Sequence, residues 1–405
     1  MADAQAAPSP GAGAAPVQAV AASVACVTAS VMPGFLAGAL GSDIKAEFGI
    51  GDTGLGVALA LTYIFAAVAI VHAGELSDRI GSRRSLMISM LVTMSGYLVV
   101  ALVARSFATL LVGLTVAGAG LTLAGPAAKV LVADHVSPQR QGLAFGVHMS
   151  AIPLGPLLAG LTVGVVGGTD GWRWPFLGGA VLAGAGMLML PRERATAPSA
   201  TRPAKDPAAG RFGHVRMGPL FVFAAAAMLA SCSVVAAAAF FVVNSEAAGI
   251  SESTAGLLLS AASAGVIAVR IALGALADRF RTGAVSTVAV LLTASAAGYA
   301  LMAANTPWLY ALGGQAAIIL GWSWPGLMVL ALVRIYPQAP GLASSFVIGG
   351  LNLGAVIGPV AFGAISDAAS SSAALAVAAA WVLGAAVLSL SSRIRLDSSR
   401  SPSGA

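Results

Sequence analysis

Two basic side chains stand inside long apolar segments of this sequence, where a charged group is costly. Lys129 comes five residues before Asp134 and Arg270 comes eight residues before Asp278, which at 1.5 Å per helical residue places them roughly 8 and 12 Å inside their segments. Such a pair could attract an anionic solute, for example a carboxylate. The alternative is that Lys129 extends to the membrane surface while Arg270 pairs with a loop acid or with carbonyls at a helix end.

Four other polar side chains in apolar segments are candidates for a binding cavity. His148 could titrate near neutrality, and Tyr63, Asn352 and Gln315 could hold a solute through hydrogen bonds. Each also fits the plainer role of a polar contact between packed helices. The 15 acidic residues all stand in loops, in tails or at segment ends, so no buried carboxylate is available to relay protons. Coupling to H+ or to another ion is therefore left open.

Catalytic and cofactor motifs are missing from the sequence. There is no Gly-Lys pair for a phosphate-binding loop, no H-E-x-x-H and no C-x-x-C, and the two cysteines stand apart inside apolar segments. We therefore expect no enzyme activity, no metal and no cofactor.

The elements that carry these residues are predicted to be transmembrane helices. Hydrophobic residues make up 58% of the chain and charged residues only 9%, against roughly 25% charged in a soluble domain. Apolar runs long enough to cross ~30 Å of hydrocarbon recur throughout, which favours an all-α integral membrane protein. The predicted spans are 17–41, 53–73, 86–104, 107–131, 142–167, 172–190, 217–243, 254–276, 284–304, 307–333, 341–366 and 373–392.

The distribution of basic residues predicts the orientation of these twelve spans. Of the 21 lysines and arginines, 16 fall on the side that holds both termini, and only Lys45, Arg105 and Arg173 fall on the other. Because cytoplasmic loops collect positive charge, we expect both termini in the cytoplasm of a cell with the chain in its cytoplasmic (inner) membrane. The net charge of +6 thus reflects topology and not nucleic-acid binding.

Similar sequence segments that stand about 200 residues apart divide the chain into two halves. Gly74–Gly81 after the second span matches Gly274–Phe280 after the eighth, which predicts two six-helix bundles with a solute site between them. The predicted organisation is a disordered tail 1–16, a first bundle 17–190, a linker 191–216, a second bundle 217–392 and a tail 393–405.

The segment "GELSDRIGSRRSLM" resembles the signature loop of the major facilitator superfamily, and "GWRWPF" at 171–176 is similar to the start of the sixth helix in many members. The resemblance implies two pseudo-symmetric six-helix bundles and a loop that takes part in gating. Alternatively, the loop only fixes topology. The candidate gating residues are Gly74, Asp78, Arg79, Gly81, Arg83, Arg84, Gly274, Asp278 and Arg279.

Glycine–proline pairs occur at matching places in the two halves, Gly155-Pro156 and Gly358-Pro359. Proline bends a helix and small residues let a facing helix approach, so these pairs are candidate hinges. The first pair also approximates a pattern of family antiporters.

Together these features predict a secondary active or facilitative transporter that moves a small organic solute by alternating access, and the two basic side chains make an anion a candidate. One alternative is an efflux antiporter for drugs or metabolites, and another is a non-transporting membrane sensor built on the same scaffold. The expected partners are this solute, a coupling ion (H+ or another) that the sequence leaves open, and the lipid bilayer, without nucleic acid, and we expect a monomer.

Overall fold

The computed structural model describes residues 14–137, 140–166, 171–192, 217–279 and 283–398. The predicted linker therefore lies outside the described residues from 193 to 216, and so do the ends of both predicted tails. The first half contains α1 (Ala14–Ala39), α2 (Gly41–Phe48), α3 (Asp52–Ile80), α4 (Ser82–Leu98), a π-helical turn (Val99–Val103), α5 (Phe107–His135), α6 (Gln141–Met149), α7 (Ala151–Val166) and α8 (Trp174–Leu188). The second half contains α9 (Met217–Ser245), η5 (Glu246–Ala248), α10 (Glu252–Arg279), α11 (Ala284–Ala303), α12 (Pro307–Trp322), α13 (Pro325–Ile335), α14 (Pro340–Ala368) and α15 (Ser371–Ser398).

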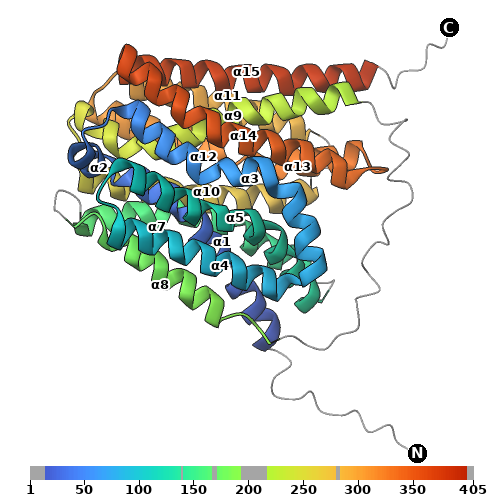
Figure 1. Ribbon diagram of the computed structural model, residues 1–405. Coiled ribbons are helices and arrows are strands. Elements are labelled where there is room, and N and C mark those ends of the chain that lie inside the picture. Colours follow the sequence, from blue (N-terminus) through green and yellow to red (C-terminus); the bar gives the residue numbers. More distant parts are fainter. Residues whose placement is uncertain (1–13, 138–139, 167–170, 193–216, 280–282, 399–405) are drawn as a thin grey trace, which may run out of the picture.

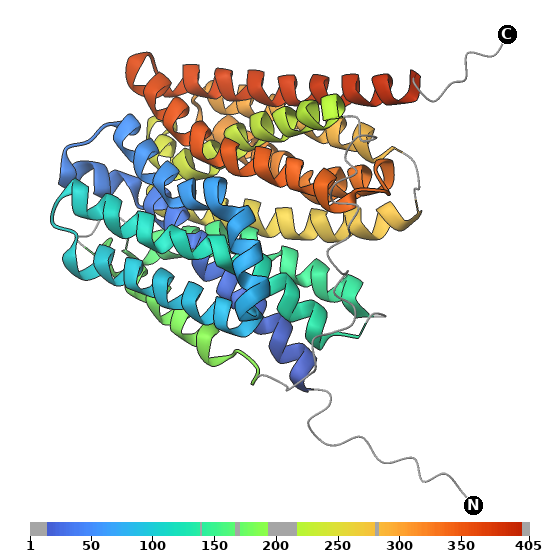
Figure 2. The same cartoon turned by 45° about the vertical axis from the view of Figure 1, so that its right-hand side comes forward.

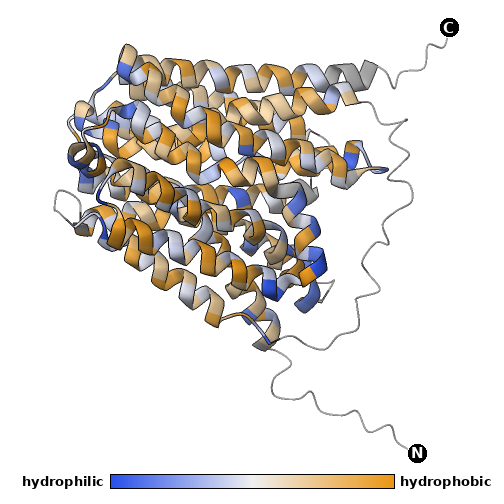
Figure 3. Cartoon of the chain, viewed as in Figure 1, coloured by the Kyte–Doolittle hydropathy of each residue, from blue (hydrophilic) through white to orange (hydrophobic). Residues whose placement is uncertain are grey.

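Every regular element among the described residues is helical, as predicted. Within the part of the chain that the structure describes, eleven stretches are long and apolar enough to cross a membrane, and Trp174–Leu188 is a shorter apolar helix. Large apolar side chains point outward, including Val165, Leu188 and Trp308, each at least 80% exposed. The hydrophobic colouring runs along the lengths of the helices, and polar residues gather at their ends (Figure 3). A lipid-facing surface explains this distribution, because water would penalise it.

Two of the predicted spans consist of two consecutive helices. The span 142–167 breaks at Ser150, between α6 and α7, and the span 307–333 breaks after Trp322, between α12 and α13. Pro153 follows the first break and has no N–H to donate to the carbonyl of Met149 four residues earlier. Pro325 begins α13, where its missing N–H costs nothing.

The two halves meet closely at the face of the molecule opposite the chain termini, here called the far face (Figure 1). A Cβ atom built on Gly56 of α3 would lie 2.3 Å from the Pro359 carbonyl oxygen of α14. On the other flank, a Cβ on Gly160 of α7 would lie 2.4 Å from the Gly256 carbonyl oxygen of α10. Small residues thus bring the backbones of the halves into direct contact, as they do in other membrane helix pairs.

Near the termini, glycines of α3, α10 and α14 have no close neighbours among the described residues. A Cβ on Gly74, Gly274 or Gly349 would meet nothing within 4 Å among the described residues. Val68 of α3 is 66% exposed and Leu143 of α6 is 77% exposed. The halves diverge toward this side in the turned view (Figure 2). The described conformation is therefore closed at the far face and open toward the face that carries the termini, here called the near face.

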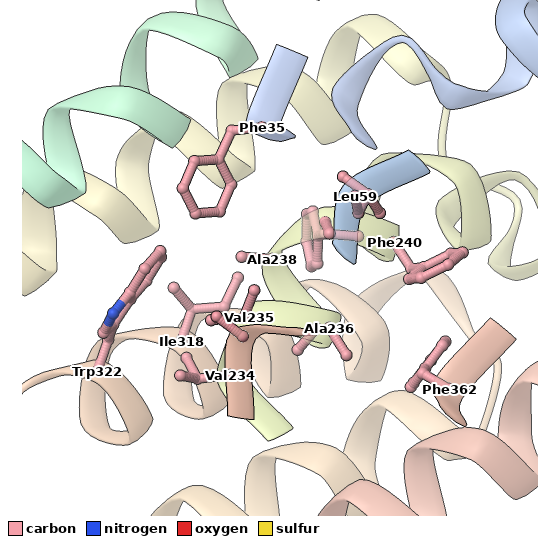
Figure 4. Close-up of a cluster of buried hydrophobic side chains, with 14 of the residues drawn as sticks. Phe35, Leu59, Val234, Val235, Ala236, Ala238, Phe240, Ile318, Trp322 and Phe362 are labelled. Atoms are coloured by element: carbon pink, nitrogen blue, oxygen red, sulfur yellow. The ribbon is translucent and has the colours of Figure 1, made fainter. Parts of the chain in front are cut away.

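A layer of apolar side chains from both halves fills the middle of the interface (Figure 4). Phe35 of α1 lies against Trp322 of α12, with ring centroids 5.4 Å apart. Phe240 of α9 stacks on Phe362 of α14 at 5.0 Å. All four rings are at most 4% exposed. Phe35 and Trp322 thus join the two halves, whereas Phe240 and Phe362 pack together within the second half.

Candidate functional site

Arg270 joins the two halves through backbone carbonyls. Its Nε and Nη2 atoms donate to the Trp322 carbonyl at 3.1 and 2.7 Å, and Nη1 donates to the Met149 carbonyl at 3.3 Å. Trp322 ends α12 in the same half, whereas Met149 ends α6 in the opposite half. The last carbonyls of a helix lack intrahelical donors, and they carry partial negative charge. Of the alternatives that the sequence left open for Arg270, the structure has the pairing with helix-end carbonyls.

Lys129 stands on α5 without a hydrogen-bond or ion-pair partner among the described residues. Its side chain is exposed. Lys129 is close enough to His148 of α6 to interact with it electrostatically. His148 is the residue before Met149, the acceptor of Arg270. Lys129 thus influences His148, and the residue after His148 in sequence accepts a hydrogen bond from Arg270; we call Lys129, His148 and Arg270 the basic cluster.

His148 is only 2% exposed, and its Nδ1 atom lies 3.1 Å from the Ser23 hydroxyl of α1. Its ring also meets Phe145 edge to face at 6.4 Å. These contacts match the role of polar packing within the first half.

The three neutral polar candidates are engaged with the protein itself. The Asn352 side-chain amide of α14 donates to the Ala66 carbonyl of α3 at 3.1 Å, across the two halves. The Gln315 amide donates to the Leu258 carbonyl at 2.8 Å within the second half. Tyr63 is 6% exposed and packs its ring against Gly34 and Phe35. The structure thus places Tyr63 at the apolar layer and Asn352 at the interface between the halves. Gln315 instead links two helices within the second half.

Two buried polar atoms near this region have no partner among the described residues. The indole N–H of Trp324, which follows the break after α12, is unpaired, and so is the Thr122 hydroxyl of α5. Neither Phe35 nor Thr122 was selected from the sequence, because an aromatic ring or a hydroxyl in an apolar run gives no signal of its own.

The Trp-Arg pair of "GWRWPF" ties the first bundle together at the far face. Trp172 Nε1 donates to Glu47 at 2.7 Å, and the Arg173 guanidinium donates to the same carboxylate at 2.8 Å and to the Ala104 carbonyl at 2.9 Å. Arg173 also lies over the Trp172 ring at 4.3 Å. The hydrogen bond from Arg173 holds the pKa of Glu47 below its ordinary value.

The sequence model of the Major Facilitator Superfamily matches residues 20–245 and 223–404, which together make up nearly the whole chain. The chain belongs to this superfamily. Curated relatives include facilitated glucose transporter member 10 of solute carrier family 2 from Homo sapiens, 30% identical over 154 residues (37% of this chain and 27% of the relative). A multidrug resistance protein B homolog of Mycobacterium tuberculosis is 34% identical over 129 residues (31% of this chain and 24% of the relative). The matches therefore span about a quarter of the length of either relative.

Solved structures share the fold over nearly the whole length of this major facilitator protein. A bacterial homolog of the human lysosomal transporter Spinster, in an inward-facing and unoccupied conformation, has a TM-score of 0.74 at 16% identity, covering 98% of this chain and 100% of that one. A D-xylose–proton symporter has a TM-score of 0.72 at 16% identity, covering 92% and 96%. The nucleoside transporter NupG has a TM-score of 0.71 at 14% identity, covering 96% and 100%.

The signature loop of this major facilitator protein is open to solvent in the described conformation. Asp78 and Arg79 are exposed on the last turn of α3, and no ion pair between them and the following arginines is present among the described residues. Gly81 separates α3 from α4 with a φ of +88°, a value that glycine adopts readily. Arg83 donates to the Pro191 carbonyl at 3.1 Å. Arg84 also takes part in a hydrogen bond, ring contact or electrostatic interaction, so it is not a free cation.

In the second copy of the loop, Gly274 is exposed on α10. The side chains of Asp278 and Arg279 lie outside the described residues. The gating role of both loops stays a prediction.

Both candidate hinge pairs lie within continuous helices and mark close contacts. Pro156 is inside α7 and Pro359 is inside α14. A Cβ on Gly155 would lie 2.7 Å from Val31, and one on Gly358 would lie 2.4 Å from the Cys232 carbonyl oxygen. The glycines therefore serve close packing inside each half.

Proposed function

We propose that this major facilitator protein carries a small organic anion across the membrane by alternating access between its two halves. The observation that carries the proposal is the basic cluster at the inner end of the contact between the halves. Lys129 lacks a partner among the described residues, and Arg270 is bound only by neutral carbonyls. The termini are cytoplasmic in this proposal, so the described conformation is the inward-facing one.

Electrostatics favour an anion at this place. An ionised group away from bulk water needs a counter-charge or strong hydrogen bonds, and helix-end carbonyls supply only a partial negative charge. Arg270 uses three of its donors on carbonyls, and Lys129 uses none among the described residues. A carboxylate that binds between them would gain charge-assisted hydrogen bonds from both halves at once.

Other solute classes fit the described residues less well. A cationic drug needs a carboxylate, but all 15 acidic residues stand at helix ends, in loops or in tails. A neutral polyol needs free hydrogen-bonding side chains, but the amides of Asn352 and Gln315 are already bound to carbonyls. The apolar layer around Phe35 and Trp322 would suit a solute with a nonpolar body.

Flux into proteoliposomes tests this function directly. A solute panel would include aromatic and aliphatic monocarboxylates, their neutral amides and cationic amines, each with and without a pH gradient. We expect saturable flux of one or more carboxylates, and weaker flux of the matching amides. Flux of amides or amines with no flux of carboxylates would overturn the anion assignment, and no flux of any solute would favour the sensor alternative.

Replacement of single cations completes this test. In Lys129→Gln we expect the KM for the anion to rise about tenfold or more, which corresponds to the loss of one charge-assisted hydrogen bond of about 1.5–3 kcal/mol. Arg140→Gln is the matched control, because it removes an exposed positive charge from the same face in a loop after α5. Equal effects in both variants would assign the change to surface charge and not to a binding site.

A further inference from the structure

At the far face, a carboxylate of the second half caps a helix of the first half. Asp367, near the end of α14, accepts the backbone N–H groups of Asp52 at 2.9 Å and Thr53 at 2.8 Å, and the Thr53 hydroxyl at 2.7 Å. Asp52 and Thr53 are the first two residues of α3. The first N–H groups of a helix have no partner inside the helix, so an external carboxylate there both completes hydrogen bonds and meets the positive end of the helix dipole.

Helix α3 has no cap of its own. Its N-cap residue is Gly51, in an extended backbone conformation and with no side chain to accept a hydrogen bond. The corresponding helix of the second half, α10, is different. Ser251 precedes it and accepts the Thr254 N–H at 3.4 Å, a cap supplied from within the same half. Only α3 of this pair therefore depends on the opposite half for its N-terminal hydrogen bonds.

Small residues make this trans cap possible. A Cβ on Gly51 would lie 2.7 Å from a carboxylate oxygen of Asp367, and a Cβ on Gly363 would lie 2.3 Å from the Asp52 carbonyl oxygen. Either substitution would push the two helix ends apart.

A second connection runs beside the first. The Ser366 hydroxyl of α14 donates to the Asp52 carboxylate at 2.6 Å, and Lys45 of α2 forms an ion pair with the same carboxylate. Asp52 is only 8% exposed although it is charged. Both of its side-chain partners are thus present while the halves are closed, and the Ser366 partner is lost when they separate.

We propose that Asp367 is the latch that holds the far face closed, because separation of the halves leaves α3 without a cap. This inference rests on the proposed alternating-access function and assigns a gating residue that no signature motif marks. The latch favours the described conformation in the absence of solute. A bound solute must supply the free energy that releases it.

The test measures the distance between the two halves at the far face. Spin labels on cysteines at Ala46 of α2 and Ala247 of η5, both exposed, report this distance by double electron–electron resonance. The background replaces the two buried native cysteines, Cys26 and Cys232, by alanine. The purified protein is measured without solute, so the result does not depend on which solute is carried.

In Asp367→Ala we expect the population that is open at the far face to rise by about 2- to 30-fold, the range that the loss of one helix cap produces. Ser251→Ala is the matched control, because it removes a cap that does not cross the halves. We expect it to lower the melting temperature without changing the distance distribution.

The double variant Asp367→Ala, Gly51→Ser separates gating from folding. Serine at position 51 supplies α3 with a cap of its own, and the extended backbone there accepts a side chain. We expect the double variant to regain thermal stability while it stays open at the far face as often as Asp367→Ala. An unchanged distance distribution in Asp367→Ala would overturn the latch. Failure of every variant to open at the far face, Gly56→Ala with its clash against the Pro359 carbonyl included, would instead overturn alternating access.

Discussion

Gly56 offers the sharpest test of how the far face closes. In Gly56→Ala the new methyl group would stand 2.3 Å from the Pro359 carbonyl oxygen, 2.8 Å from its carbonyl carbon and 3.1 Å from the Val360 Cα atom. All three are backbone atoms, so no side-chain rotation relieves the contact. Normal van der Waals separation requires α3 and α14 to move apart by about 1 Å.

The free-energy cost follows from this displacement. Overpacking of a close contact by one methyl group costs about 1–3 kcal/mol. That cost falls on the far-face-closed conformation alone, because the contact does not exist once the halves have separated. We therefore expect the ratio of far-face-open to far-face-closed molecules to rise by about 5- to 150-fold. Thiol-reactive labelling of a cysteine placed at Ala60 on α3, in the cysteine-free background, measures this ratio as a labelling rate from the outer side of vesicles.

Gly74, on the same helix, is the matched control. A methyl group at Gly74 meets nothing within 4 Å in the described conformation, so Gly74→Ala carries no steric cost there and gains helix propensity of up to about 1 kcal/mol. If the signature loop packs against the other half when the near face closes, Gly74→Ala disfavours that state. The two alanine variants should then shift the labelling rate in opposite directions. A rate that Gly56→Ala leaves unchanged, with a native melting temperature, would refute the backbone contact as the closed gate.

Three further predictions concern charge. Lys129→Arg, which keeps the cation, should retain most anion flux, whereas Lys129→Met should lose most of it; equal losses would exclude a charge role. Arg270→Lys should reduce flux at least fivefold, because an ammonium group cannot reproduce the paired donation to the Trp322 carbonyl; wild-type flux would show that the carbonyl bridge is dispensable. The pKa of Glu47 is lowered by the Arg173 hydrogen bond, so its stabilising effect is present at neutral pH and is lost as the pH falls through the folded-state pKa. Melting temperatures measured between about pH 6 and about pH 3 should fall less steeply in Glu47→Gln than in the wild type, and parallel curves would contradict this.

The sequence predicts the helices well because length and hydropathy alone decide which segments can cross a bilayer. It predicts their ends less well. Helix α3 continues to Ile80, seven residues past the predicted end of its span, since leaving the hydrocarbon does not break intrahelical hydrogen bonds. Helix α2 was missed altogether, because its eight residues "GSDIKAEF" are too polar and too few to register as an apolar run.

Which groups the site residues bind was beyond sequence reasoning for a physical reason, even where the kind of partner was expected. Arg270 was recognised as a buried cation, and helix-end carbonyls were among its expected partners. The two carbonyls that it binds are 52 and 121 residues away, and their availability depends on helix breaks that hydropathy does not detect. The proline at position 153 was the available signal, since a missing N–H frees the Met149 carbonyl. Asp367 gave no signal, because acidic residues commonly stand at the ends of membrane spans.

On both flanks of the interface, the hydrogen bond closest to the near face has a main-chain carbonyl as its acceptor. Among hydrogen bonds that cross the halves in the described residues, the ones nearest the near face are Asn352 to the Ala66 carbonyl on α14–α3 and Arg270 to the Met149 carbonyl on α10–α6. The internal repeat aligns Asn352 with Met149, because each stands six residues before the proline-preceding glycine of its half. On each flank, therefore, a side chain of the second half meets a main-chain carbonyl of the first at equivalent depth. Because these acceptors are main-chain carbonyls, they do not depend on which side chains the first half carries at Ala66 and Met149, as long as its backbone keeps its path. The Met149 carbonyl at this level belongs to the surroundings of the basic cluster, so under the proposed function an anion that enters from the near face would first meet both halves here.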